Sequence, residues 1–198
     1  VLGAPVAMAA DAYCAGTATQ NYGAAGDQVV CGEGAVAAGI GGIAVGAGAT
    51  YNGNTYVGAS SSGAGSIAIG TASNAASGTP EVASAATAVG FGTFAAGSQA
   101  AAFGTRARAE VTQSIAIGND TRATGTGSVS IGGDDSNSYN KYVFPAAVVG
   151  YSTNAGSPTT SGNWRPTFSA GDGALAISPH AQALTQGSTA IGVGATAG

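Results

Sequence analysis

Small and large side chains alternate along the middle of the chain and repeat with a period of 14 residues. Residues 86–99 (ATAVGFGTFAAGSQ), 100–113 (AAAFGTRARAEVTQ) and 114–127 (SIAIGNDTRATGTG) follow one another without a gap, and SVSIG opens a further copy at 128. A short fixed period is typical of a solenoid, in which each repeat is one coil that buries apolar surface against the adjacent coils. The pattern therefore predicts a stack of coils.

Within each copy, counted from position one at residue 86, the first five positions alternate in size. Positions three and five hold Ala, Ser or Gly, and positions two and four hold the larger residues. Since side chains alternate across a strand, the larger residues share one face of a short strand. A second strand is expected from position eight, where small residues again occupy every other site, and glycines suit the tight turns. Each coil is thus predicted to hold two strands, as in a β-roll.

Charged residues recur on the other face of the second strand. Positions seven, nine and eleven carry Arg106, Arg108, Glu110, Asp120 and Arg122, and we expect all of them to face water. Arg106 and Asp120 hold position seven of adjacent coils. They should therefore stack about 5 Å apart as an exposed ion pair that adds little stability.

Two packings are compatible with this alternation. If the small faces of both strands meet inside, the roll is thin and the larger residues form an apolar stripe outside. The opposite packing, with Ile and Val inside against the small residues of the second strand, stays open. We favour the first packing, and because a monomer rarely exposes so long an apolar stripe, the stripe is predicted to join subunits. The predicted interface residues are Val89, Phe103, Ile115, Ile117, Val129, Ile131 and Ile191.

The repeated pattern S-x-A-[IV]-G-x-x-[AST]-x-A-x-G closely resembles the head domain of YadA-like trimeric autotransporter adhesins, and the resemblance covers roughly residues 28–198. It implies an all-β fold, a left-handed parallel β-roll solenoid of about 14-residue coils that assembles as a homotrimer. It also implies an exposed passenger head at the outer membrane of a Gram-negative bacterium. The membrane anchor is expected to be absent from this fragment.

From residue 28 the repeat can be followed to residue 198 as twelve coils, which begin at 28, 42, 54, 66, 86, 100, 114, 128, 146, 160, 174 and 188. Insertions are expected near 75–85, 133–145 and 151–173. At about 4.8 Å per coil, such a stack would be about 55 Å long. Residues 1–27 fit the repeat poorly and are predicted to form an N-terminal cap.

Cys14 and Cys31 are the only cysteines and are candidates for a disulfide in an exported protein. If residues 14–27 followed the repeat, the two residues would lie about 10 Å apart along the strand direction. A bridge requires Cα atoms within about 7 Å. Either this segment leaves the roll or the thiols are not joined. We favour a non-repetitive cap tied down by a bridge that stabilises it by about 3 kcal/mol.

Composition and motifs argue against several other functions. The chain has 198 residues with five Lys and Arg against nine Asp and Glu, so no basic patch for nucleic acid is expected. No apolar run is long enough to predict a membrane span. No Ser/His/Asp set, C-x-x-C or phosphate loop with a lysine occurs, so we expect no enzyme, no cofactor and no metal site. His180, the only histidine, is expected to be a solvated turn residue.

The remaining function is binding. The resemblance implies a multivalent adhesin for host matrix proteins (collagen, fibronectin or laminin) or cell receptors. Either the repetitive lateral face or the aromatic insertions could bind the ligand, and the aromatic residues could also simply fill irregular parts of the repeat. Exposed Trp, Tyr and Arg are typical binding anchors. The ligand-binding candidates are Tyr139, Lys141, Tyr142, Phe144, Trp164, Arg165 and Phe168.

Three other classes of solenoid protein share features with this sequence. Ice-binding solenoids share the richness in Ala, Gly and Thr, but T-x-T occurs here only in isolated places such as Thr17 to Thr19. A purely structural surface solenoid is the second alternative. Trimeric β-helix acyltransferases use a histidine, but their repeat is a hexapeptide with three strands per coil, unlike the 14-residue period here.

Overall fold

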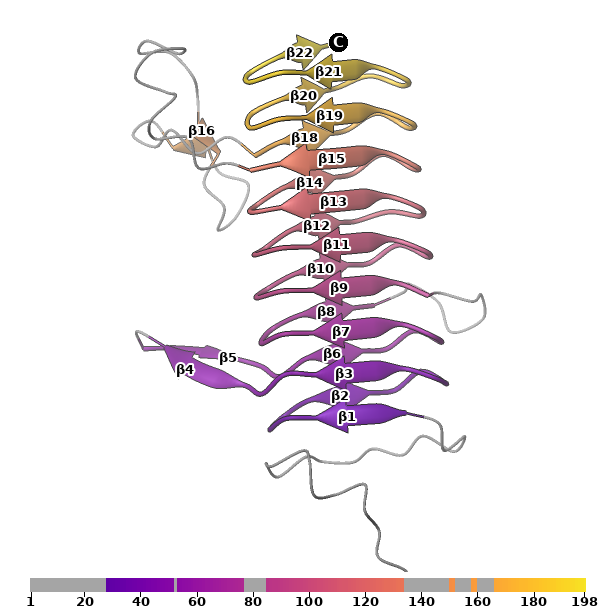
Figure 1. The fold of residues 1–198 in the computed structure, drawn as a ribbon, viewed down its shortest axis with the longest axis vertical. Coiled ribbons are helices and arrows are strands. Elements are labelled where there is room, and N and C mark those ends of the chain that lie inside the picture. The colour runs from indigo at the N-terminus through magenta and orange to yellow at the C-terminus, as the bar shows by residue number, and fades with distance from the viewer. Residues whose placement is uncertain (1–27, 52, 77–84, 134–149, 152–157, 160–165) are drawn as a thin grey trace, which may run out of the picture.

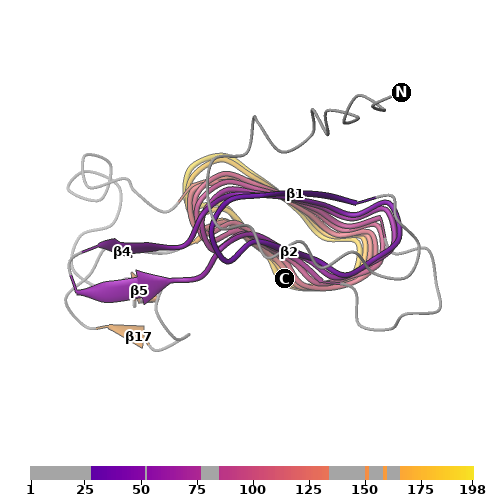
Figure 2. The ribbon, with the colours of Figure 1, turned by 90° about the horizontal axis from the view of Figure 1, so that it is seen from below.

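The computed structural model of the chain describes residues 28–51, 53–76, 85–133, 150–151, 158–159 and 166–198. Within these residues the fold is all-β and contains no helix. Two parallel sheets of nine strands lie face to face, and each coil of the chain contributes one strand to each sheet (Figures 1 and 2). The arrangement is a two-sheet solenoid, compatible with the predicted β-roll.

The first sheet, sheet A, takes the first strand of each coil. Its strands are, in spatial order, β1 (Val29–Cys31), β3 (Ile43–Val45), β7 (Ile67–Ile69), β9 (Thr87–Val89), β11 (Ala101–Phe103), β13 (Ile115–Gly118), β15 (Val129–Gly132), β19 (Leu175–Ile177) and β21 (Thr189–Ile191). Neighbouring strands pair in register with the repeat, so that Ala102 lies opposite Ala88 on one side and Ala116 on the other.

The second sheet, sheet B, takes the second strand of each coil. Its strands are β2 (Val36–Ala37), β6 (Ser60–Ser61), β8 (Asn74–Ala75), β10 (Phe94–Ala95), β12 (Arg108–Ala109), β14 (Arg122–Ala123), β18 (Phe168–Ser169), β20 (Gln182–Ala183) and β22 (Thr196–Ala197). The register again follows the repeat, with Arg108 opposite Phe94 and Arg122.

The interior between the sheets holds only small side chains along the regular coils. Every buried hydrophobic residue of the described chain is an alanine, and Ala88, Ala102, Ala95 and Ala109 are fully buried in one cluster. Thr and Ser fill most of the remaining buried sites. This confirms the packing in which the small faces meet inside and the larger residues of positions two and four lie outside.

Serine at position one closes the turn that leads into sheet A. The Ser114 hydroxyl donates to the Val111 carbonyl oxygen at 2.7 Å and accepts from the Val111 amide at 3.3 Å. Ser66 and Ser188 make the same pair of bonds to Gly63 and Thr185. The serine of the repeated motif is therefore a turn residue whose hydroxyl is satisfied by the backbone of the turn that it closes.

Glycine at position five lets successive coils approach closely. Gly118 has φ +124°, and a Cβ there would overlap the carbonyl oxygen of Gly132 in the next coil. Gly104 stands in the same relation to Gly118. Both the backbone conformation and the contact between coils therefore require glycine at this position.

The stack contains nine coils in the described residues, since each sheet has nine strands, and the prediction of twelve is wrong. The coil expected at residue 54 is instead part of a hairpin, in which β5 (Asn54–Tyr56) pairs antiparallel with β4 (Ala49–Tyr51). In the repeat Tyr56 would take position three, where the interior accepts only Ala or Ser. A tyrosine is too large for that space, so the chain leaves the stack.

The coil expected at residue 146 does not join sheet A either, because β15 pairs directly with β19. Residues 150–151 form β16 (Gly150–Tyr151), which pairs antiparallel with β17 (Pro158–Thr159). Residues 167–173 complete the coil that begins at 128, with Thr167 and Ser169 buried at the small positions. Nine coils at about 4.8 Å make a stack about 40 Å long, shorter than expected.

Both small antiparallel sheets leave the stack at the same edge. The β4–β5 hairpin lies between β3 and β6, and β16–β17 lies between β15 and β18, so each follows a strand of sheet A and precedes one of sheet B (Figure 1). Tyr56 of the hairpin packs edge-on against Phe91, with ring centroids 4.8 Å apart. The predicted cap at 1–27 and most of the predicted insertion near 75–85 lie outside the described residues.

Candidate binding surfaces

The outer face of sheet A carries a continuous row of apolar residues, which we call the apolar ladder. It consists of the position-four side chain of each strand, which are Cys31, Val45, Ile69, Val89, Phe103, Ile117, Ile131, Ile177 and Ile191. Ile117 is 38% exposed in the middle of the stack and Ile191 is 63% exposed near its end. The predicted interface residues Ile115 and Val129 lie beside the ladder at position two and are partly buried.

The outer face of sheet B carries a row of four large planar side chains, which we call the arginine–phenylalanine row. Phe94, Arg108, Arg122 and Phe168 come from β10, β12, β14 and β18 and lie in register. The Arg108 guanidinium carbon lies 4.7 Å from the centroid of the Phe94 ring, and that of Arg122 lies 5.9 Å from the Phe168 centroid. Each arginine is thus stacked against a phenylalanine at cation–π distance.

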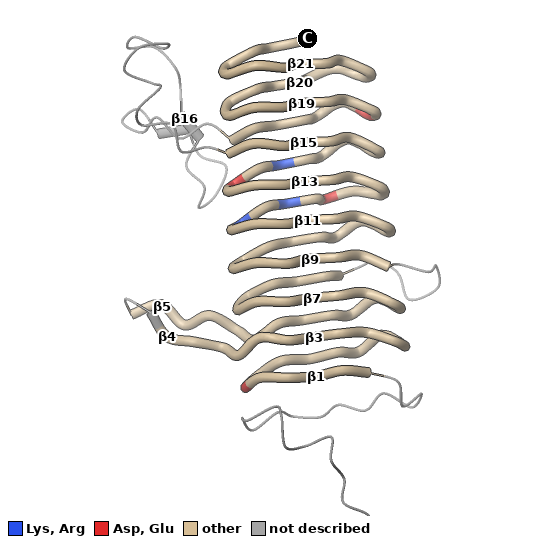
Figure 3. Tube along the Cα trace, in the orientation of Figure 1, with Lys and Arg blue, Asp and Glu red and all other residues tan. Residues whose placement is uncertain are grey.

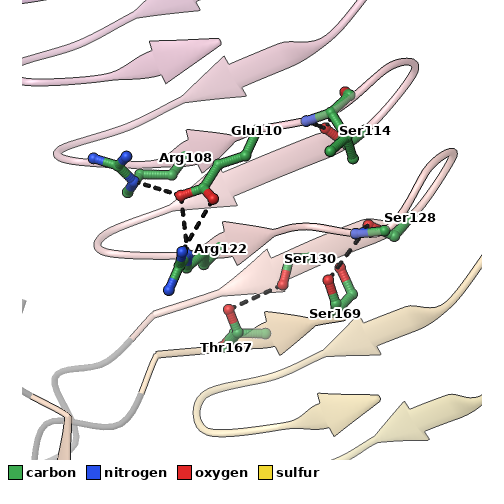
Figure 4. Close-up of polar contacts among 10 residues, drawn as sticks. Arg108, Glu110, Ser114, Arg122, Ser128, Ser130, Thr167 and Ser169 are labelled. Atoms are coloured by element: carbon green, nitrogen blue, oxygen red, sulfur yellow. Dashed lines mark hydrogen bonds and ion pairs between the residues drawn. The ribbon is translucent and has the colours of Figure 1, made fainter. Parts of the chain in front are cut away.

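Glu110 joins the two arginines of this row (Figure 4). Its Oε1 accepts from Arg108 Nε at 2.7 Å and from Arg122 Nε at 2.9 Å, and its Oε2 accepts from Arg122 Nη2 at 3.0 Å. Burial alone would raise the pKa of Glu110, but the hydrogen bonds and charges of Arg122 and Arg108 outweigh it and hold the pKa below its usual value. The carboxylate is therefore ionised at neutral pH and fixes both guanidinium groups.

Arg106 and Asp120 form the predicted ion pair. Both residues were predicted to be exposed, and for Asp120 that prediction is wrong. Arg106 Nη2 donates to Asp120 Oδ2 at 2.9 Å, and Nε lies 2.9 Å from Oδ1. Asp120 is only 7% exposed. Position seven belongs to the turn before β12 and β14, with φ 54° at Arg106 and 52° at Asp120, and not to the outer face of the strand. The arginine of one coil covers the carboxylate of the next.

His180 is buried, with 1% of its surface exposed, so the prediction of a solvated turn residue is wrong. It also occupies position seven, with φ 64°. Its amide donates to the carbonyl oxygen of Gly133 at 3.4 Å, next to the point where the chain leaves β15. Position seven is therefore an inward turn site in this coil as it is at Asp120.

The predicted ligand-binding residues fall almost entirely outside the described residues. Among them are Tyr139, Lys141, Tyr142, Phe144, Trp164 and Arg165. Phe168 is described and lies in the arginine–phenylalanine row, not in an insertion. Cys31 is disulfide-bonded, whereas Cys14, its predicted partner, is outside the described residues. The arginine–phenylalanine row was not predicted as a unit, although its four residues all occupy position nine of their coils and could have been recognised by comparing that position from coil to coil.

The described part of the chain offers neither a metal site nor a membrane-spanning helix. Those residues contain no group of three or more His, Cys, Asp and Glu arranged to hold a metal ion. None of their elements is a helix of the length and hydrophobicity needed to cross a membrane. The described surface has an apolar stripe on the outer face of sheet A and the arginine–phenylalanine row on that of sheet B. Figure 3 shows that the charged residues of the stack gather on few of its coils.

No protein-family model matches the sequence, and neither the curated proteins nor the solved structures contain a match.

Proposed function

We propose that the chain is the head of a bacterial surface adhesin, a left-handed β-roll that assembles as a homotrimer and binds host matrix proteins or cell receptors. The observation that carries the proposal is the apolar ladder, which runs the whole length of sheet A and stays partly or fully exposed in a single chain. A monomer rarely exposes a contiguous apolar surface of this length.

The interior offers little to compensate for that exposure. Its hydrophobic residues are alanines, whose side chains bury little surface each. Covering an Ile, Val or Phe side chain completely stabilises a protein by about 1.5–3 kcal/mol. Association through the apolar ladder therefore supplies hydrophobic burial that the thin interior of one chain lacks.

Assembly around sheet A would leave sheet B and the β4–β5 edge of each subunit facing outward. Each binding surface would then occur three times on one rigid body, and simultaneous engagement raises avidity by about 10²-fold or more over a single site. A repetitive ligand such as collagen, fibronectin or laminin suits this geometry. The proposed setting is the outer membrane surface of a Gram-negative cell, where such a head is displayed.

Binding to immobilised collagen, fibronectin and laminin tests the proposal. The wild-type protein is expected to be retained on at least one of these surfaces or on host cells, and Ile117→Asp, which places a carboxylate in the ladder, should be folded but retained at least tenfold less (about 1.4 kcal/mol). Thr112→Asp adds the same charge in the exposed turn between β12 and β13, on the outer face of neither sheet, and should bind like wild type. Retention on none of these surfaces, or equal retention of the Ile117→Asp variant as a monomer, would contradict the proposal.

A further inference from the structure

The described cations are unevenly placed on the molecule. The described residues contain three, Arg106, Arg108 and Arg122, and Figure 3 shows them on neighbouring coils. Arg106 is engaged with the buried Asp120. Arg108 and Arg122 share one carboxylate, that of Glu110, so their cluster keeps a net positive charge on a chain with formal net charge −4.

Both arginines of the cluster retain hydrogen-bond donors. A guanidinium has five N–H donors. Arg108 uses Nε for Glu110, and Arg122 uses Nε and Nη2, and within the described residues no acceptor lies on Arg108 Nη1 or Nη2 or on Arg122 Nη1. The two side chains are 49% and 42% exposed. Unused donors of two adjacent guanidinium groups therefore face solvent.

The cluster is also held in place before any ligand arrives. Glu110 fixes one edge of each guanidinium, and the Phe94 and Phe168 rings support their flat faces. Side chains that are already ordered lose less conformational freedom on binding. A guanidinium of fixed orientation matches the planar fork of a carboxylate or the oxygens of a sulfate.

The surroundings indicate an extended ligand. Position eleven, two residues after the row along each strand, carries the small residues Ala96, Thr124 and Ala170 in the neighbouring coils. The side chains of the arginine–phenylalanine row therefore project beyond their neighbours and do not line a pocket. Four rungs at about 4.8 Å span about 14 Å from Phe94 to Phe168. Apolar ring surface at both ends and anion-binding donors in the middle suit a chain of sugar rings that carry acidic groups.

We propose that the arginine–phenylalanine row binds an acidic polysaccharide, with Arg108 and Arg122 donating to its carboxylate or sulfate groups and Phe94 and Phe168 packing against its sugar rings. The site adds a ligand class to the proposed adhesive function. It does not rest on the trimer, because one chain supplies all four residues.

Calorimetric titration of the full chain with two hexasaccharides tests the site and separates the two anions. One is a heparin hexasaccharide, which carries sulfates in addition to carboxylates, and the other is hexagalacturonate, which carries only carboxylates; a neutral dextran oligomer is the blank. At least one acidic oligosaccharide should bind. Arg108→Gln and Arg122→Gln should each weaken that binding by about tenfold or more, the equivalent of one charge-assisted hydrogen bond.

Thr112→Glu is the matched control. It changes the net charge by the same amount as Arg108→Gln, but Thr112 is exposed in the turn between β12 and β13 at the other edge of the coil. Its affinity should stay within about twofold of wild type if the site, and not the overall charge, binds the sugar. The Ile117→Asp variant should keep the single-site affinity even if it loses adhesion, which separates this inference from the proposed function.

Three results would overturn the inference. The first is no binding of either acidic oligosaccharide. The second is an equal loss in Thr112→Glu and in the arginine variants, which would mean that only bulk charge acts. The third is tighter binding of hexaglutamate than of both oligosaccharides, which would make the ligand an acidic peptide.

Discussion

Asp120 and Arg106 contribute unequally to their ion pair, because the carboxylate is buried and the guanidinium is partly exposed. An exposed pair adds little stability, since water solvates both partners after either is removed. A buried carboxylate that loses its main cation is left with part of its desolvation cost uncompensated. The burial of Asp120 therefore changes what a substitution at Arg106 should do.

We expect Arg106→Ala to lower the free energy of unfolding by about 1–3 kcal/mol, because it removes a charged donor from a buried acceptor. Chemical denaturation at neutral pH measures it. Arg108→Ala is the control, since Glu110 keeps Arg122, and it should cost under about 1 kcal/mol. Combining Arg106→Ala with Asp120→Asn should recover much of the loss. An unchanged stability of Arg106→Ala would mean that the carboxylate is solvated after all.

At the level of single residues, alternation in the sequence predicted which strand residues share a face, but it left two packings open, and the structure shows that the small residues lie inside. Each strand turns one face toward the space between the sheets and the other toward solvent. Ala88 and Ala95 are therefore buried, and Val89 is partly exposed. Position seven could not be assigned this way. Asp120 and His180 lie in turns with positive φ, where the rule of two faces does not apply.

At the level of the coil, two glycines that look equivalent in the sequence play different roles. Gly118 at position five has φ +124° and lies against the backbone of Gly132, whereas Gly127 at position fourteen has φ +64° and open space around it. Gln113 occupies position fourteen of the previous coil with φ 59°. Position fourteen thus tolerates a side chain, and position five has no room for one.

Gly118→Ala should therefore lower the free energy of unfolding by at least about 3 kcal/mol, since backbone strain and the displacement of the next coil add together. Gly127→Gln should cost about 1–2 kcal/mol, the usual penalty of a left-handed residue. Thermal and chemical unfolding of both variants gives the comparison. Equal losses would show that contact between coils does not constrain position five.

The period of the repeat predicted the nine coils of the stack and failed at residues 54, 146 and 160, where no separate coil begins. NTYVG matches the motif in its Val57 and Gly58, but Tyr56 at position three cannot enter an interior of alanine and serine. A pattern search weighted towards the small positions would have rejected it. The antiparallel pairing of β16 with β17 carries no comparable signal, because it depends on where the chain turns after leaving β15.

At the level of the whole molecule, the two outer faces differ in kind. Sheet A presents the apolar ladder over all nine strands, whereas sheet B presents Ser, Asn, Phe and Arg at position nine in its middle coils. Such asymmetry is expected of a subunit that hides one face and displays the other. The favoured packing placed the ladder outside, as the structure has it, but whether and how many chains meet on it is a property of the assembly, which the pattern of one chain does not encode.

We expect the wild-type chain to sediment as a trimer and to melt at a temperature that rises with protein concentration, since association stabilises the folded state by mass action. Ile117→Asp would bring three carboxylates together in an apolar seam, at a cost of several kcal/mol per buried ion. It should sediment as a folded monomer with a lower, concentration-independent melting temperature. Ile117→Val, which keeps the seam apolar, should stay trimeric. A wild-type monomer at micromolar concentration would contradict the assembly, whereas a stable trimer of the Asp variant would place the interface away from the apolar ladder.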